Sequence, residues 1–156
     1  KLLGRLDNND IYAFQGSYAQ LEYPENLSSA RYAAQRFSAV YDRYLNDSNR
    51  VYLSVIPDKG YFMEGNPKMD YAAFLTELRQ GVPFASFIDL FPALSLKDYY
   101  RTDTHWRQEA LAPAARRLAQ GMGKELTEEY TVQTAYSDFL GVYAGQSALP
   151  MEPEST

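Results

Sequence analysis

One apolar run, at residues 50–56, constrains the fold of this chain most strongly. It reads Arg-Val-Tyr-Leu-Ser-Val-Ile, and such a β-branched, almost continuously apolar run is typical of a central parallel strand buried on both faces. The longest helical pattern comes directly before it, with apolar residues three or four apart from Leu27 to Leu45 and a cap at Asn26 or Ser28. A helix followed by such a strand predicts a parallel sheet with helices packed against it.

Further strand and helix patterns surround this run. Two short β-like runs lie on either side of Gln15-Gly16-Ser17 and predict a hairpin. Near the other end, Pro113 predicts a late start or a kink in the last helix. The expected elements are strands at 11–14 and 18–21, a helix at 27–45, a strand at 50–56, a helix at 70–79, a strand at 84–90, a helix at 107–120 and a strand at 130–134.

The order of these elements predicts the fold class. Strands that alternate with helices favour an α/β layer sandwich with a parallel sheet. We expect one domain at residues 1–143 and a loose tail at residues 144–156, which is small and polar. Open α/β sheets place ligands beyond the carboxyl ends of their strands, where Pro57-Asp58-Lys59-Gly60 follows the central run. We expect Lys59 there to be a solvated turn residue.

Composition excludes several functions. The 156 residues carry a net charge of −5 with no basic block, which disfavours nucleic-acid binding. The chain has no Cys, so disulfides, Cys-based zinc sites and thiol catalysis are excluded. No apolar run approaches the ~18–20 residues of a membrane-spanning helix. The 14 Tyr and 8 Phe suit half-buried surfaces and grooves that face carbohydrate.

The best functional lead is the segment Asp103-Thr104-His105-Trp106. His105 is the only histidine of the chain, and Trp106 is its only tryptophan. If the segment is extended, residues two apart point to the same side, so the Asp103 carboxylate and the imidazole project together. A carboxylate beside an imidazole fixes its tautomer and orientation while the ring moves protons. The spacing therefore indicates an acid–base pair.

In two interpretations, these residues are not an acid–base pair. In the first, Asp103 or Thr104 is the N-cap of the following helix and His105 only supports the helix end. In the second, Asp103 and His105 are two ligands of a metal ion, which needs a third ligand such as Asp89. We expect no metal site and no cofactor.

Two further interpretations assign the segment an activity or a ligand. In one, Asp103 orients His105, which takes a proton from a hydroxyl nucleophile in hydrolysis or acyl transfer. No serine of the chain lies in a Gly-x-Ser-x-Gly or Gly-Asp-Ser motif, and we expect Ser17 and Ser147 to be structural. In the other, aromatic side chains at residues 99, 100 and 106 form a binding surface that stacks on sugar rings.

The eight residues 99–106, Tyr-Tyr-Arg-Thr-Asp-Thr-His-Trp, resemble the signature of the bacterial DHHW proteins, with Thr104 in place of the first His. The Asp-Thr-His-Trp core also resembles a segment of the alginate O-acetyltransferase relatives of the SGNH hydrolases. Residues 55–59, Val-Ile-Pro-Asp-Lys, are similar to the strand that ends in Pro-x-Lys in those proteins, and Phe139-Leu140-Gly141 is similar to the stretch after their motif helix.

The resemblance implies a three-layer α/β/α, SGNH-like (flavodoxin-like) sandwich with a mostly parallel sheet. It implies an extracytoplasmic O-acetyltransferase or esterase that modifies a cell-surface polysaccharide or another acylated glycan. Asp103 would be the orienting acid and His105 the general base, and Tyr100, Arg101 and Trp106 would bind substrate. The nucleophilic serine of these families lies in a later block, so we expect a fragment whose serine lies outside this chain. The alternative is a non-catalytic glycan-binding or cell-surface assembly module.

Overall fold

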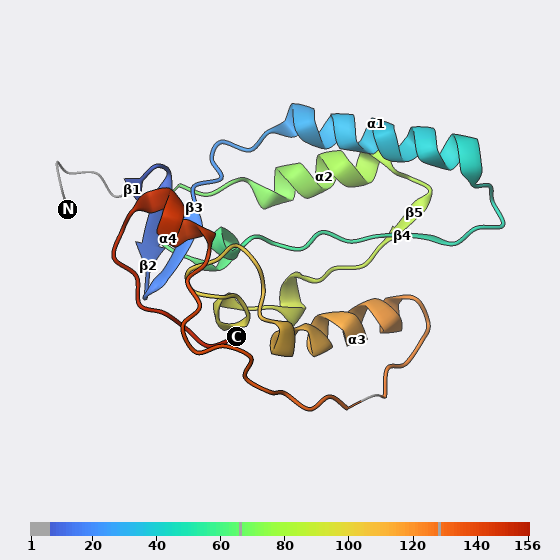
Figure 1. The fold of residues 1–156 in the computed structure, drawn as a ribbon. Helices are drawn as coiled ribbons and strands as arrows, with labels where there is room; N and C mark the ends of the chain where they lie inside the picture. Colours follow the sequence, from blue (N-terminus) through green and yellow to red (C-terminus); the bar gives the residue numbers. More distant parts are fainter. Residues whose placement is uncertain (1–6, 66, 128) are drawn as a thin grey trace. The chain divides into compact units, whose positions relative to one another are not determined.

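The computed structural model describes residues 7–65, 67–127 and 129–156 and has a mixed α/β fold. Figure 1 shows its helices and strands in chain order. They divide into two compact units, whereas the sequence pattern predicts a single domain. The first unit consists of the described parts of Lys1–Leu21, Ile56–Pro67 and Leu90–Thr156, and the second consists of Glu22–Val55 and Lys68–Asp89.

The first unit begins with an antiparallel sheet in the order β1-β2-β3. Its strands are β1 (Asp7–Asn8), β2 (Ile11–Phe14) and β3 (Ser17–Gln20), and β2 and β3 form the predicted hairpin. The turn residues Gln15 and Gly16 have φ values of 49° and 78°, and two such positive values are what a type I′ hairpin turn requires. Tyr12 and Ala19 pack with Met63 in an apolar cluster.

Short helical turns and two α-helices make up the rest of the first unit. The turn η4 (Gln108–Ala110) precedes α3 (Leu111–Gly121), which places Pro113 in the first turn of α3. Proline is tolerated there because its missing N–H would have no partner inside the helix. The late start of this helix is confirmed. The other elements are η1 (Lys59–Phe62), η2 (Phe91–Ala93), η3 (Leu96–Asp98) and α4 (Val142–Ser147).

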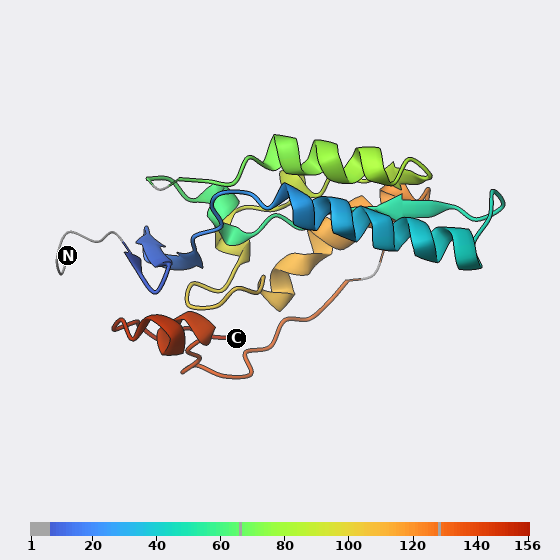
Figure 2. The ribbon, with the colours of Figure 1, turned by 90° about the horizontal axis from the view of Figure 1, so that it is seen from above.

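The second unit contains two helices that pack side by side, α1 (Leu27–Tyr44) and α2 (Tyr71–Gly81), as Figure 2 shows. The Asn26 side chain caps α1 by accepting a hydrogen bond from the Ser29 N–H at 2.9 Å, which confirms the predicted cap. The helices approach each other closely at Gly81 and Ala34. A Cβ atom on residue 81 would collide with the Cβ of Ala34, so glycine is needed for this approach.

A parallel pair of strands completes the second unit. The strands β4 (Val51–Leu53) and β5 (Ala85–Phe87) pair in parallel. The core of the unit is a cluster of Ala34, Leu78 and Val82, against which partly buried apolar side chains pack, including Leu53, Val55, Phe74 and Phe84. β4 is shorter than the predicted strand, and its residues are half-buried rather than buried on both faces.

Two expectations about the sheet differ from the structure. Parallel pairing among the described residues is confined to β4 and β5, and the other sheet is antiparallel. The predicted strand at residues 130–134 is wrong: this segment has no strand assignment, and Tyr130 and Val132 are 69% and 65% exposed. Side chains that favour strands stabilise one only when they pack against neighbours. No helix of the described chain has the length and apolar character to cross a membrane.

Candidate functional site

Residues 99–106, here called the motif loop, reverse the direction of the chain. Tyr99 and Trp106 form an antiparallel bridge at the base of the loop, and the Tyr100 N–H donates to the His105 carbonyl at 3.1 Å. The following helical turn begins only at Gln108, with Arg107 as its N-cap. The interpretation of Asp103 or Thr104 as a helix cap is therefore wrong.

Asp103 and His105 contact each other as the spacing predicts, but through a bend rather than an extended strand. Oδ1 of Asp103 lies 2.6 Å from Nδ1 of His105 and also accepts from the His105 backbone N–H at 2.9 Å. An aspartate that accepts from the N–H two residues on forms a local turn. Because an ionised carboxylate only accepts hydrogen bonds, this contact places the ring proton on Nδ1 and leaves Nε2 as the basic nitrogen.

The carboxylate of Asp103 is buried and fully engaged, with its side chain 7% exposed. Its second oxygen, Oδ2, accepts from the Val142 N–H at 2.9 Å. Burial acts to raise the pKa of Asp103, but the hydrogen bonds from His105 and Val142 outweigh burial and lower the pKa below its ordinary value. Asp103 is therefore a stable anion that can orient the imidazole.

His105 has the opposite environment. Its side chain is 74% exposed. Within the described part of the chain, its only side-chain hydrogen-bond partner is Asp103, so Nε2 is open to solvent. A ring that is anchored on one nitrogen and accessible on the other has the arrangement of a general base.

Lys59 supports the motif loop from η1, and the expectation that it is solvated is wrong. It is 2% exposed, and its ammonium group donates to the carbonyls of Tyr100 at 2.8 Å, Arg101 at 3.0 Å and Asp103 at 2.8 Å. Burial lowers the pKa of Lys59 to about 8, while the nearby carboxylates of Glu154 and Asp103 act to raise it. The ammonium is buried because three carbonyls of the loop replace its water.

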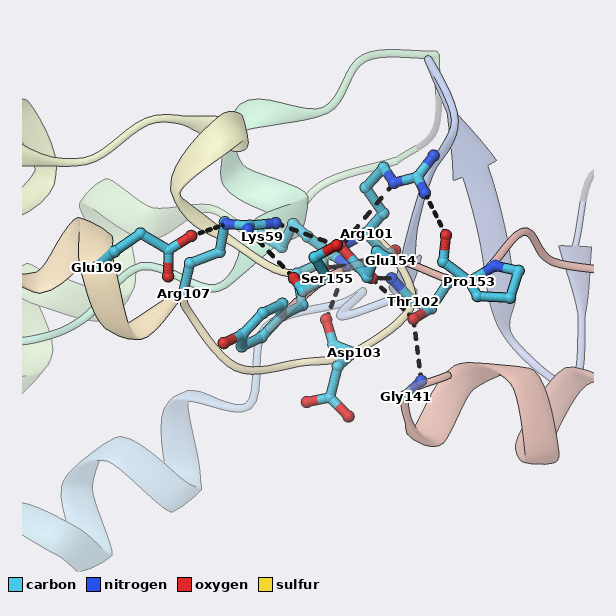
Figure 3. Close-up of polar contacts among 11 residues, drawn as sticks. Lys59, Arg101, Thr102, Asp103, Arg107, Glu109, Gly141, Pro153, Glu154 and Ser155 are labelled. Carbon is cyan, nitrogen blue, oxygen red and sulfur yellow. Dashed lines mark hydrogen bonds and ion pairs between the residues drawn. The ribbon is translucent and has the colours of Figure 1, made fainter. Parts of the chain in front are cut away.

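Glu154 lies in the tail and contacts the same loop. Residues 153–156 of the tail are here called the C-terminal segment. Its side chain is only 4% exposed. Oε1 accepts from the N–H and the hydroxyl of Thr102, both at 2.8 Å, and Oε2 accepts from the Arg101 N–H at 2.8 Å (Figure 3). The tail was expected to be loose, but its first residues belong to α4, and Glu154 then pairs with Phe139.

Gly141 brings the start of α4 against the motif loop. Its N–H donates to the Thr102 hydroxyl at 2.9 Å, and the Tyr143 N–H donates to the Thr102 carbonyl at 3.1 Å. A Cβ atom at residue 141 would lie 2.5 Å from the Thr102 carbonyl oxygen and closer still to the Cβ of Asp103. Only glycine allows this approach, which places the Val142 N–H on Asp103.

The three residues expected to bind substrate lie on the same loop. The Tyr100 ring packs against Phe139, with ring centroids 5.2 Å apart, and the Arg107 guanidinium lies 5.2 Å from its centroid. Arg101 donates to the Pro153 carbonyl at 3.0 Å, and Trp106 is half-buried at the base of the loop. Tyr100 and Arg101 thus have partners within the chain.

Sequence reasoning missed three residues of this arrangement. Lys59 stands at the end of the apolar run, where its position beyond a strand was a usable signal. Gly141 falls in the Phe-Leu-Gly stretch of the resemblance, but nothing local indicates the close approach. Glu154 carries no local signal, because it lies among small and polar residues beside Pro153.

Metal ligands do not gather around the pair in the part of the chain that is described. No three or more His, Asp or Glu side chains there lie in an arrangement that could hold a metal ion. Comparisons of the chain with protein-family models, with curated proteins and with solved structures found no match.

Proposed function

We propose that this chain carries the acid–base half of an SGNH-like acyl-transfer site, in an extracytoplasmic carbohydrate O-acyltransferase or esterase. In this proposal Asp103 orients His105, and His105 is the general base. The substrate is an O-acylated glycan of the cell surface. Two arguments support the proposal: the geometry of the pair, and the resemblance of residues 99–106 to the DHHW signature.

One observation carries the chemistry. A buried carboxylate lies 2.6 Å from Nδ1 of the only imidazole in the chain, while the ring itself is mostly exposed. The second oxygen of this carboxylate accepts from the Val142 backbone N–H at 2.9 Å. The same features are required of an orienting acid, which must stay ionised and fixed while the ring gains and loses a proton.

The proposed reaction is a double displacement. Nε2 of His105 takes the proton of a serine hydroxyl as the serine oxygen bonds to the acyl carbon of the ester. The resulting imidazolium returns that proton to the departing sugar oxygen as the ester bond breaks. A water molecule or an acceptor sugar hydroxyl then gives its proton to His105 as its oxygen bonds to the acyl carbon. The imidazolium returns that proton to the serine oxygen as the bond between the serine and the acyl group breaks. In the families that residues 99–106 resemble, the nucleophilic serine follows in a later block, so the serine in this proposal comes from outside residues 1–156.

The fold expectation that accompanies this function is the three-layer α/β/α sandwich. The parallel pair of β4 and β5, with α2 between them in the chain, is one β-α-β unit of such a fold. We propose that this unit belongs to a larger parallel sheet of the SGNH type. The antiparallel strands β1 to β3 form a separate sheet and are not part of this unit.

The test is an ester-cleavage assay on the full-length protein, with an aryl acetate and an O-acetylated oligosaccharide as substrates. His105→Ala removes the base, and Asp103→Asn leaves the ring in the wrong tautomer, so each should lower turnover by a factor on the order of 10⁴. Gln108→Ala, an exposed change in the next turn, is the matched control and should retain full activity.

Equal turnover in the unaltered protein, His105→Ala and Asp103→Asn would rule out the catalytic role of the pair. Glycan binding that is lost in Trp106→Ala, in a protein without esterase or transferase activity, would favour the binding module instead. The two functions are therefore separated by one set of variants.

A further inference from the structure

We propose that Glu154, in the C-terminal segment, is a positioning residue for His105. It acts through Thr102 and the start of α4 on the carboxylate of Asp103. The inference deepens the proposed function, because positioning matters only if His105 is the base. Its test nevertheless reads the geometry of the ring directly and needs no catalysis.

A carboxylate at residue 154 fits the motif loop in a way that no other side chain does. Its two oxygens accept from three donors, which are the N–H groups of Arg101 and Thr102 and the Thr102 hydroxyl. Glutamine has the same shape, but its NH₂ group cannot accept and would face one of these donors. A neutral replacement therefore leaves a buried donor of the loop without a partner.

The Thr102 hydroxyl connects Glu154 to α4 with a fixed direction. The Gly141 N–H can only donate to this hydroxyl, at 2.9 Å, and the Glu154 carboxylate can only accept from it, at 2.8 Å. The hydroxyl proton must therefore point to Glu154, and the oxygen lone pairs must face Gly141. Thr102 is 1% exposed, so water does not compete with either contact.

The next residue completes the connection. The Val142 N–H donates to Oδ2 of Asp103 at 2.9 Å, while Oδ1 of the same carboxylate contacts Nδ1 of His105. Because the N–H groups of Gly141 and Val142 are adjacent in the backbone, a shift of the first displaces the second. Loss of the Glu154 contact thus frees the Asp103 carboxylate to turn away from the ring.

Two arginines anchor Glu154 in this position. Arg107 donates to the Ser155 carbonyl at 3.2 Å and places a second guanidinium nitrogen 3.6 Å from Oε2 of Glu154. Arg101 donates to the Pro153 carbonyl at 3.0 Å. Their charges reduce the cost of burying the carboxylate, and their bonds to the neighbouring carbonyls fix the segment that carries it.

The experiment records the imidazole ¹⁵N spectrum of the 156-residue chain, in which His105 is the only histidine. Nitrogen shifts distinguish the Nδ1–H from the Nε2–H tautomer, and the hydrogen bond at one nitrogen sets which form is present. Glu154→Gln should move the neutral ring from mainly Nδ1–H toward Nε2–H. Glu152→Gln, the same change at an exposed residue of the tail, should leave the spectrum unchanged.

Thr102→Val and Thr102→Ser form a second, independent pair. Valine removes the hydroxyl and should reproduce the shift, whereas serine keeps the hydroxyl and should retain the Nδ1–H form. An unshifted spectrum in Glu154→Gln overturns the role of Glu154, whatever Thr102→Val does. If Glu154→Gln does not fold, an unshifted Thr102→Val spectrum overturns it. An Nε2–H ring in the unaltered chain counts instead against the proposed base.

Discussion

Asp103 differs from an ordinary surface aspartate in the number of hydrogen bonds that its carboxylate accepts. The backbone N–H and the ring of His105 share one oxygen, and the Val142 N–H binds the other. These contacts lower the pKa of Asp103 in spite of its burial. A group whose pKa is lower in the folded state stabilises the fold above its unfolded pKa, and this contribution is lost as the pH falls through the folded value.

The expected consequence is a pH-dependent effect of Asp103→Asn on stability. At pH values above the ordinary pKa of 3.8, the free energy of unfolding of the variant should be about 1.5–3 kcal/mol lower than that of the unaltered chain. The reason is that charge-assisted hydrogen bonds are lost. The difference between the unaltered chain and the variant should shrink as the pH falls below that value. Urea unfolding across this pH range measures it, and a difference that does not vary with pH would contradict the assignment.

At the scale of elements, the start of α4 determines the geometry of the pair. Helix α4 is short. Its N-cap residue, Gly141, allows the backbone at the start of the helix to approach Thr102 and Asp103 closely. The φ of Gly141 is −80°, which any residue adopts. The requirement for glycine is therefore one of space and not of backbone conformation.

Gly141→Ala should therefore destabilise the chain and detach α4 from Asp103. The new methyl would lie 2.5 Å from a backbone oxygen that has no freedom to move alone, and overpacking of this kind costs about 1–3 kcal/mol. Gly145→Ala is the matched control inside α4, because its Cβ would meet nothing within 4 Å. Equal unfolding free energies for the two variants in urea would contradict the close approach.

Elements with local causes could be predicted from the sequence, and elements with distant partners could not. The α1 helix has its cap and apolar stripe within its own residues, and the hairpin has its turn at Gln15-Gly16. The segment at 130–134 has strand-forming residues but no neighbour to pair with among the described strands. Local propensity could not report that difference.

At the scale of the whole molecule, the motif loop is held by residues far from it in the chain. Lys59 lies 41 residues before its partner Tyr100, and Glu154 lies 53 residues after its partner Arg101. The spacing of Asp103 and His105 predicts their contact, because both lie within three residues. The spacing could not predict that Lys59 and Glu154 hold the motif loop in place, because these two residues become buried only when the chain folds.

The single histidine of the molecule also permits the most direct test of the central claim, that Asp103 presents Nε2 of His105 as a base. We predict that the ¹⁵N spectrum of the neutral ring in the unaltered 156-residue chain shows the Nδ1–H tautomer. The ring in Asp103→Asn should show mainly Nε2–H, because the amide keeps only one accepting oxygen and its NH₂ group can face Nδ1 and donate to it. An Nε2–H ring in the unaltered chain, or identical spectra for the two proteins, would contradict the account.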